Sequence, residues 1–359
     1  MKAIAISLAP NYRLSDFFPT DKKLTGFTAL FDSGRTAGYF LLKSLGVGPG
    51  DEVIVQAFTC VAVENLVRWT GATPVFCDID DTLNLAPVDL KKKISKKTKV
   101  VIYQGTMGNI GKIGEIREIC RRSGAILVGD CAHQISFDFE HAFYSFGRDK
   151  VISGVWGGAA VTNRELPSLP LRMAYREYFW AVLSYFIARF YDLGKFVHYF
   201  LRRANLVSKV LTDEEKNGAM PSNFYSMPKL FEGIAATQLA RLDELVAHRR
   251  KLAKYYAREL GLKFHPDWTY LRFNIFVSEP DSLRKFAAKE NIFLGDWYNT
   301  PVSPRGAATT YKTGSCPRVE RYCSTIVNLP TNPNLNLDDA KKVVEVVKLW
   351  SRETGIKIS

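Results

Sequence analysis

The sequence lacks several features that would assign it quickly to a class of protein. No run of about 18 apolar residues occurs, which excludes an ordinary membrane-spanning helix. The first residues hold too short an apolar stretch for a secretory signal, so we expect a cytoplasmic protein. The six cysteines are scattered, without a C-x-x-C pair or a histidine cluster. This argues against a zinc site and against a disulfide scaffold, so we expect reduced thiols and no metal.

Familiar catalytic motifs are also missing. The sequence shows no Gly-x-Ser-x-Gly elbow, no HExxH motif and no paired-carboxylate signature. The glycine-rich stretch GVGPGDE (46–52) follows a predicted helix and precedes a predicted strand. Dinucleotide- and phosphate-binding loops need the opposite order, strand before helix, so we interpret this stretch as a structural turn.

The composition is that of an ordinary globular protein, with 47% apolar and 24% charged residues. A chain of 359 residues is long enough for two domains. Lys and Arg number 49 against 36 Asp and Glu, a net charge of +13. The excess favours anionic partners such as phosphorylated substrates, although a generally basic surface explains it equally well. Because no recognisable nucleic-acid-binding module is present, we expect no nucleic-acid partner.

Short apolar segments alternate with helical patterns between residues 26 and 163, which predicts a mostly parallel α/β sheet. The predicted strands are Phe27–Phe31, Glu52–Gln56, Thr73–Cys77, Lys99–Gln104, Ala125–Gly129, Ala142–Ser145 and Ala159–Thr162. The predicted helices are Thr36–Leu45, Val61–Thr70, Pro87–Ile94 and Ile113–Ser123.

The second half of the chain departs from this alternation. Residues 164–222 form a basic, aromatic-rich insertion, and one long helix is predicted from Lys229 to Gly261. The remainder reads as a smaller α/β unit, with a strand at 271–278 and helices at 282–291 and 338–350. We therefore divide the chain into a large domain (1–228), a connecting helix (229–261) and a small C-terminal domain (262–359).

Ligands of parallel α/β sheets bind beyond the carboxyl ends of the strands, and three stretches there carry reactive side chains. GDCAHQ (129–134) places Asp130 after an apolar strand, as a helix cap or as the counter-ion of a cationic ligand atom. SFGRDK (145–150) ends on Lys150, either a solvated loop residue or a nucleophile for carbonyls. DSGRTAG (32–38) joins a strand to a helix, as a simple cap or as an anion site.

Taken in order, these motifs resemble the DegT/StrS family of pyridoxal-phosphate-dependent sugar aminotransferases. The resemblance covers roughly residues 26–163 and 226–350. It is carried by DSGRTAG, GVGPGDEVIVQAFTCVAVENLV, GATPVFCDID, GDCAHQ, SFGRDK, GGAAVTN, ATQLARLDELVAHRRKLAKYY, GDWYNTPVSP and IVNLPTNPNL. The fold it implies is that of fold-type I pyridoxal-phosphate enzymes, with a large mostly parallel α/β domain and a smaller C-terminal α/β domain.

The resemblance also implies roles for single residues. Lys150 falls where the family carries its Schiff-base lysine, and Asp130 on the carboxylate that pairs with the pyridine nitrogen. These two are the implied catalytic residues. The implied cofactor-binding residues are Arg35, Thr36, Ala37, Cys60, Asp130, His133, Ser145, Lys150 and Asn223. Cys60 stands near where the family commonly stacks an aromatic ring on the cofactor, with Phe58 as a possible substitute, and Trp156 replaces a glutamate common after the lysine.

The implied reaction moves an amino group from an amino acid, by resemblance glutamate, to a keto-sugar attached to a nucleotide diphosphate. The implied assembly is a homodimer with active sites at its interface, and such enzymes serve polysaccharide biosynthesis. Two alternatives remain: a sugar dehydratase of the same family, in which histidine replaces the lysine, and a regulatory or non-catalytic pyridoxal-phosphate-binding protein.

The insertion carries one further expectation. Residues 177–204 combine a short aromatic apolar run with basic residues: Arg172, Arg176, Arg189, Lys195, Arg202 and Arg203. Such a pattern is typical of helices that cover an active site or pack against a partner subunit. It also fits a helix lying on an anionic membrane, and so peripheral contact with the inner face of the cytoplasmic membrane.

Overall fold

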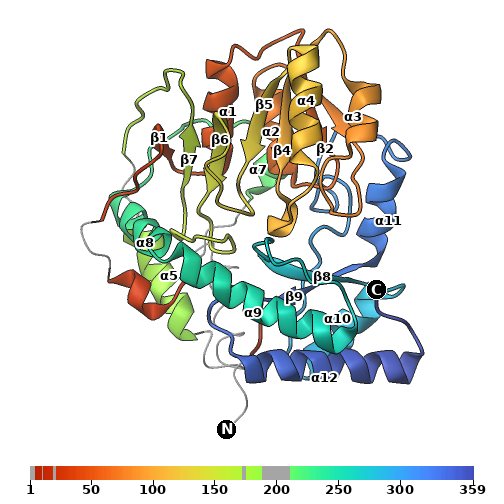
Figure 1. The fold of residues 1–359 in the computed structure, drawn as a ribbon. Helices are drawn as coiled ribbons and strands as arrows, with labels where there is room; N and C mark the ends of the chain where they lie inside the picture. The colour runs from red at the N-terminus through yellow and green to blue at the C-terminus, as the bar shows by residue number, and fades with distance from the viewer. Residues whose placement is uncertain (1–4, 10, 19–21, 172–174, 188–210) are drawn as a thin grey trace.

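A seven-stranded sheet forms the centre of the chain (Figure 1). The structure is a computed structural model and describes residues 5–9, 11–18, 22–171, 175–187 and 211–359. The spatial order is β1-β7-β6-β5-β4-β2-β3, and among these strands only β7 runs antiparallel to its neighbours. The predicted mostly parallel α/β sheet is therefore confirmed. The strands are β1 (Ala29–Phe31), β2 (Glu52–Gln56), β3 (Thr73–Cys77), β4 (Thr98–Gln104), β5 (Ile126–Asp130), β6 (His141–Ser145) and β7 (Gly158–Val161).

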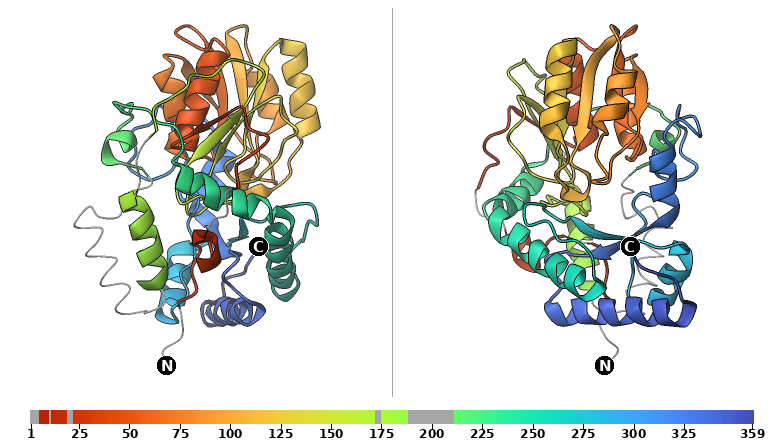
Figure 2. Two further views of the ribbon diagram at one scale, coloured as in Figure 1. Left: turned by 90° about the vertical axis from the view of Figure 1, so that its left-hand side faces the viewer. Right: turned by 45° about the vertical axis from the view of Figure 1, so that its right-hand side comes forward.

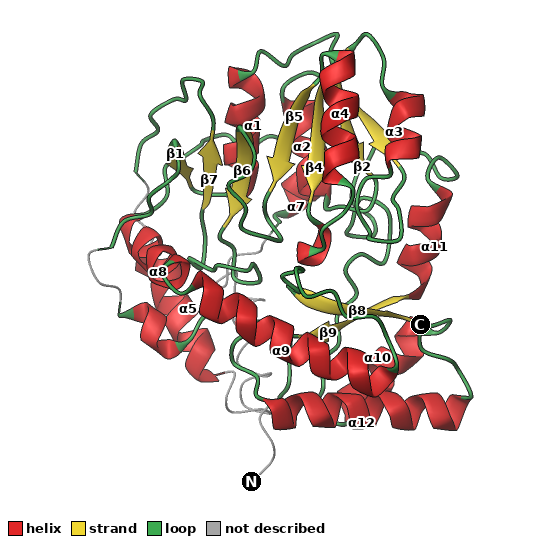
Figure 3. Cartoon of the chain, in the orientation of Figure 1, coloured by secondary structure: helices red, strands yellow, loops and turns green. Residues whose placement is uncertain are grey.

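Both faces of this sheet are buried, which explains why its strands are apolar throughout. Along β2, Val53 and Val55 belong to the core on one face and Ile54 to the core on the other. Helices cover both faces, as Figure 3 shows. Helices α1 and α2 contribute to the first core, and α3, α4 and α8 to the second. The bounds are α1 (Gly34–Ser44), α2 (Val61–Trp69), α3 (Pro87–Lys93), α4 (Ile113–Ser123) and a short 3-10 turn η2 (Thr106–Gly108).

The prediction of one long helix from Lys229 to Gly261 is wrong. The chain forms two helices, α8 (Lys229–Leu239) and α9 (Leu242–Leu260), and α9 ends with Gly261 in the left-handed conformation. Next to the break, the Gln238 amide donates to Asp16 Oδ2 (3.0 Å) and Arg241 Nη1 lies 3.4 Å from Asp16 Oδ1. Asp16 is buried, so these two contacts satisfy a carboxylate that water does not reach. The helical spacing of apolar residues does not predict such a contact with a distant segment.

A second, smaller unit lies beneath the main sheet (Figure 2). Its two antiparallel strands are β8 (Arg272–Phe276) and β9 (Ile326–Pro330), with α10 (Pro280–Lys289), α11 (Pro317–Thr325) and α12 (Leu337–Thr354). Its core joins Leu252 and Tyr256 of α9 to Val343 and Trp350 of α12. Ile6, from the start of the chain, packs into the same core, so the N-terminal segment reaches this unit as well.

The structure describes the insertion only in part. Helix α5 (Tyr175–Ile187) packs beside the 3-10 turn η1 (Leu14–Phe17), where the Tyr178 hydroxyl donates to the carbonyl of Phe17 (2.6 Å). Residues 188–204 of the basic aromatic stretch lie outside the described residues. The insertion ends with the short helix α7 (Asp213–Lys216). Across the described residues, every helix is too short or too polar to cross a membrane.

Candidate active site

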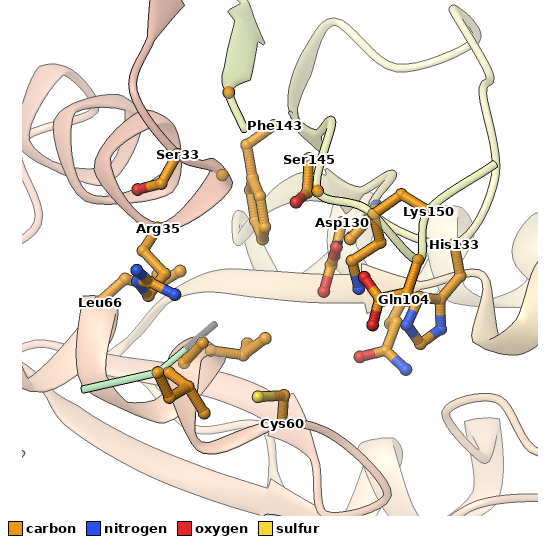
Figure 4. Close-up of a pocket in the computed structure, with 18 of the residues that line it drawn as sticks. Ser33, Arg35, Cys60, Leu66, Gln104, Asp130, His133, Phe143, Ser145 and Lys150 are labelled. Atoms are coloured by element: carbon orange, nitrogen blue, oxygen red, sulfur yellow. Dashed lines mark hydrogen bonds between the residues drawn. The ribbon is translucent and has the colours of Figure 1, made fainter. Parts of the chain in front are cut away.

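The topology brings the predicted site residues to one edge of the sheet. Strands β1, β6, β5, β4 and β2 run in the same direction, so their carboxyl ends meet there, together with the amino end of β7. A pocket at this edge encloses about 730 Å³, part of it open to solvent (Figure 4). Its lining includes Ser33, Arg35, Cys60, Leu66, Gln104, Asp130, His133, Phe143, Ser145, Lys150, Trp156, Leu211 and Tyr298.

Asp130 is the buried acid of this pocket. It ends β5 and is 2% exposed, and its Oδ1 accepts the backbone N–H of Ala132 (3.0 Å). Burial raises the pKa of this carboxyl to about 6, while the N–H of Ala132 and the charge of Lys150 lower it in part. Within the described residues Asp130 forms no salt bridge, so its carboxylate suits a cationic ligand atom.

His133 connects this strand end to the smaller unit. Its Nδ1 accepts the backbone N–H of Met107 (3.2 Å), and its Nε2 lies 3.2 Å from the hydroxyl of Tyr298. Burial, with Lys150 and Arg272 nearby, lowers the pKa of His133 well below its ordinary value, so the ring is neutral. A neutral ring that accepts at Nδ1 carries its proton on Nε2, and therefore donates to the Tyr298 oxygen. This leaves the hydroxyl proton of Tyr298 available to a ligand in the pocket.

Lys150 enters the pocket from a short, anchored loop after β6. Its backbone N–H donates to the carbonyl of Gly147 (3.1 Å), and its own carbonyl accepts the Asn11 amide (2.8 Å). The ammonium Nζ lies 4.9 Å from the ring centroid of Trp297. Figure 4 shows Lys150, Asp130 and His133 gathered on the same side of the pocket. A lysine amine beside a buried carboxylate can attack a carbonyl and then carry a proton.

The opposite side of the pocket is formed by the first turn of α1. The Ser33 hydroxyl caps this helix by accepting the backbone N–H of Thr36 (3.2 Å), and the Thr36 hydroxyl donates to Asp32 Oδ1 (2.7 Å). A Cβ on Gly34 would lie 2.8 Å from Cβ of Ser145, so glycine lets the helix start press against the end of β6. A helix N-terminus at this place attracts anions such as phosphate.

The pocket brings together most, not all, of the implied cofactor-binding residues. Those that line it are Arg35, Cys60, Asp130, His133, Ser145 and Lys150. Thr36 and Ala37 are buried in α1, and Asn223 is exposed; the pocket lining includes none of the three. Phe58 is also buried outside the lining, edge-to-face on Tyr298 at 5.3 Å between ring centroids. Cys60 and Trp156 do line the pocket.

Sequence reasoning gave no role to several residues that the pocket includes. Gln104 ends β4 and stands beside Asp130 in the sheet register. Its signal, a polar residue after an apolar strand, is the one that singled out Asp130. Tyr298 lies in the quoted stretch GDWYNTPVSP, and Leu66 and Leu211 are apolar residues without a local signature.

Pyridoxal phosphate fits this donor set. Asp130 offers an anion for a protonated ring nitrogen, Lys150 an amine for the aldehyde, and the start of α1 an anion site for the phosphate. In the described residues no cluster of His, Cys, Asp or Glu gathers that could hold a metal ion. Sheet, second unit and pocket together are those of a fold-type I pyridoxal-phosphate enzyme.

Comparison with known proteins specifies the family. The sequence matches the DegT/DnrJ/EryC1/StrS aminotransferase family over residues 25–184 and 195–348, and the chain belongs to this family. This confirms the resemblance seen in the sequence.

Among solved structures, the fold is similar to that of DesV from S. venezuelae: the TM-score is 0.68 at 24% identity, over 90% of this chain and 84% of that one. It is also similar to a putative sugar aminotransferase from Streptococcus pneumoniae in its PMP form, with a TM-score of 0.72 at 19% identity over 97% and 98% of the two chains. A third similar fold is 3-amino-5-hydroxybenzoic acid synthase, with a TM-score of 0.68 at 19% identity over 91% and 88%.

Proposed function

We propose that the chain transfers an amino group from glutamate to a keto-sugar carried on a nucleotide diphosphate. The observation that carries the proposal is the meeting of Lys150 and Asp130 in one pocket at the sheet edge. Bound pyridoxal phosphate supplies an electron-accepting ring that stabilises negative charge on a substrate carbon. The protein's part is to hold that ring, to keep its nitrogen protonated and to move protons.

Each proposed role follows from position. Asp130, a buried carboxylate, holds the proton of the ring nitrogen through its negative charge. The Lys150 amine would take a proton from the α-carbon of the amino-acid donor and return it to the former aldehyde carbon of the cofactor, across the transferred nitrogen, as general base and then general acid. The Tyr298 hydroxyl, which accepts from His133 Nε2, directs its own proton into the pocket and remains neutral because burial raises its pKa.

Two features support a nucleotide-linked sugar as the acceptor. One structure of similar fold is described as a putative sugar aminotransferase. The net charge of +13 favours an anionic substrate such as a nucleotide diphosphate.

The two half-reactions test the proposal separately. Glutamate added to the yellow holoenzyme should bleach its absorbance and release 2-oxoglutarate, whereas aspartate and alanine should do so much more slowly. A nucleotide-linked keto-sugar should then restore the yellow colour, and the same sugar without its nucleotide should restore it poorly. Bleaching by glutamate without recovery on any keto-sugar would exclude a sugar acceptor. No response to any amino acid would favour the alternative, a non-catalytic cofactor-binding protein.

Two further proposals concern the enzyme's partners. We propose a homodimer, because the family resemblance implies one and the exposed Asn223 lies one residue out of register with the family's asparagine that reaches the partner subunit; light scattering at micromolar concentration tests it. We also propose that helix α5 and the neighbouring Phe18, together called the α5 region, contact an anionic membrane surface. It is supported by three exposed aromatic side chains, Phe18 (75%), Tyr175 (64%) and Phe179 (58%), since aromatic side chains favour the interfacial region of a bilayer.

A further inference from the structure

Arg35 and Glu215 form a largely enclosed ion pair at the edge of the pocket. Arg35 Nε lies 2.9 Å from Glu215 Oε1, and the two side chains are 19% and 8% exposed. Arg35 is the second residue of α1 and lines the pocket. Glu215 belongs to α7 and is not one of the lining residues. Figure 4 shows Arg35 across the pocket from Lys150 and Asp130.

An arginine in the first turn of a helix needs an anion nearby. The helix dipole places partial positive charge at that end, so a second positive charge there is unfavourable on its own. The first turn of α1 contains no acidic residue; Asp32, just before the helix, and Glu215, from a distant part of the chain, both place negative charge near Arg35, and Glu215 forms the ion pair. A guanidinium offers several N–H donors in a planar fork, so it can hold a carboxylate and a phosphate together.

Hydrogen bonds of its side chain and backbone hold Glu215 itself in place. Its Oε2 accepts the backbone N–H of Thr212 (2.9 Å), and the Thr212 hydroxyl accepts the backbone N–H of Glu215 (3.2 Å). The Glu215 carbonyl accepts from the amide of Asn65, a buried residue of α2 (2.6 Å). One carboxylate oxygen therefore caps α7, while the other is directed at Arg35.

The segment around Glu215 is fastened to both parts of the molecule. The indole of Trp69 in α2 donates to the carbonyl of Gly218 (3.2 Å). The backbone N–H of Ala308 donates to the carbonyl of Lys216 (2.7 Å). Leu211, at the beginning of this segment, lines the pocket. Within residues 211–218 it is therefore Leu211 that lines the pocket, while Glu215 reaches the pocket through its ion pair with Arg35.

We propose that Glu215 is a positioning residue, which holds the Arg35 guanidinium at the anionic end of the pocket so that it binds the cofactor's phosphate. The inference rests on the proposed binding of pyridoxal phosphate in this pocket. Glu215 thus makes the end of the insertion part of the cofactor site, although its own side chain does not line the pocket.

The test compares two probes on the cofactor-free full-length protein: pyridoxal phosphate, and pyridoxal, which lacks the phosphate. Removing a hydrogen bond to a charged group should weaken the binding of pyridoxal phosphate on the order of tenfold in Glu215→Ala. Glu215→Gln offers one oxygen acceptor where the native carboxylate offers two, one to Arg35 and one to the Thr212 N–H, so it should also weaken the binding of pyridoxal phosphate, by less than Glu215→Ala. Arg35→Ala should lose at least as much affinity for pyridoxal phosphate as Glu215→Ala does. The double variant should lose no more affinity than Arg35→Ala alone.

Pyridoxal should bind all of these variants as it binds the native chain. Glu214→Ala is the matched control, because it removes the same charge from an exposed position of α7. Equal loss of both probes, or native affinity for pyridoxal phosphate in Glu215→Ala, would overturn the inference. A native chain that binds neither probe would instead refute the proposed function. If Glu215→Ala does not fold, Arg35→Lys is measured instead, because lysine keeps the positive charge but not the planar set of N–H donors. A loss of affinity confined to pyridoxal phosphate supports the inference, and an unchanged affinity refutes it.

Discussion

The hydroxyl of Tyr298 lies 3.2 Å from Nε2 of His133, although 165 residues separate them in the sequence. Because His133 Nδ1 accepts the Met107 N–H, the Tyr298 oxygen is an acceptor and its proton is directed elsewhere. His133 and Trp297 are also stacked, with ring centroids 5.6 Å apart. This contact joins the end of β5 to a loop of the smaller unit.

Tyr298→Phe tests whether that proton is used. The ring and its packing remain, so the variant should bind the cofactor, while kcat should fall by about tenfold to a hundredfold if the hydroxyl serves in proton transfer. Steady-state kinetics and a spectroscopic cofactor titration on the same preparation measure the two effects. An unchanged kcat would restrict Tyr298 to a structural role. His133→Phe, which removes the donor, is the companion variant and should lower kcat in the same direction.

Asp130→Asn tests the electrostatic role of the buried acid. The variant keeps the shape and the oxygen that accepts from Ala132, but it removes the charge that holds the ring proton. Amino transfer should fall about a hundredfold or more, as when other preorganised charges are lost at active sites, while the cofactor still binds. The measurement is kcat in cofactor-saturated protein. A rate near that of the native enzyme would make Asp130 only a cap.

The raised pKa of Asp130 predicts that rising pH lowers the stability of the cofactor-free protein but raises its affinity for the cofactor. Without cofactor, the folded state holds the carboxyl proton up to about pH 6, whereas the unfolded chain releases it near 3.8. Stability is therefore lost as pH rises through this window, and above it the buried charge costs about 3 kcal/mol. Cofactor-free Asp130→Asn should resist urea better than the native chain at pH 7.5 and equally at pH 3.5.

The native chain's affinity for pyridoxal phosphate should instead fall as pH drops below about 6, because a protonated carboxyl no longer pairs with the ring nitrogen. Asp130→Asn should not show this fall. A cofactor-free variant less stable than the native chain at pH 7.5 would contradict the assignment of Asp130 as a buried charge.

Asp130 and Lys150 line one pocket, as their positions in the sequence predicted. These positions could be predicted because the strands of a parallel sheet are apolar, so a polar residue at or just after a strand end stands out in the sequence. The topology then gathers the carboxyl ends of the strands at one edge of the sheet. Gln104 gave the same signal at the end of β4, but no chemistry was assigned to it from the sequence.

Contacts between distant segments could not be predicted in this way. Glu215 meets Arg35, and Asp16 meets Gln238 beside the break between α8 and α9, only because the fold brings them together. Periodicity describes one element at a time, and neither contact leaves a local pattern.

Membrane contact is tested by sedimentation with vesicles that contain phosphatidylserine. The native chain should co-sediment at low salt, and it should be released at high salt because surface charges are screened. Replacing Phe18, Tyr175 and Phe179 with serine should abolish binding. The matched control replaces Val88, Ile110 and Leu349, exposed apolar residues elsewhere on the surface, and should bind as the native chain does. A native chain that stays in the supernatant, or equal loss in both variants, would exclude the α5 region as a membrane contact.

Covalent attachment of the cofactor is the most direct test of the account. Purified protein incubated with pyridoxal phosphate is treated with borohydride, which fixes the link between the cofactor's aldehyde and a lysine amine, and its peptides are identified by mass spectrometry. The account predicts a yellow protein before reduction, the cofactor's mass on the peptide that contains Lys150, and neither in Lys150→Ala. A colourless protein that takes up no cofactor, or a cofactor fixed to a lysine outside the pocket, would contradict it.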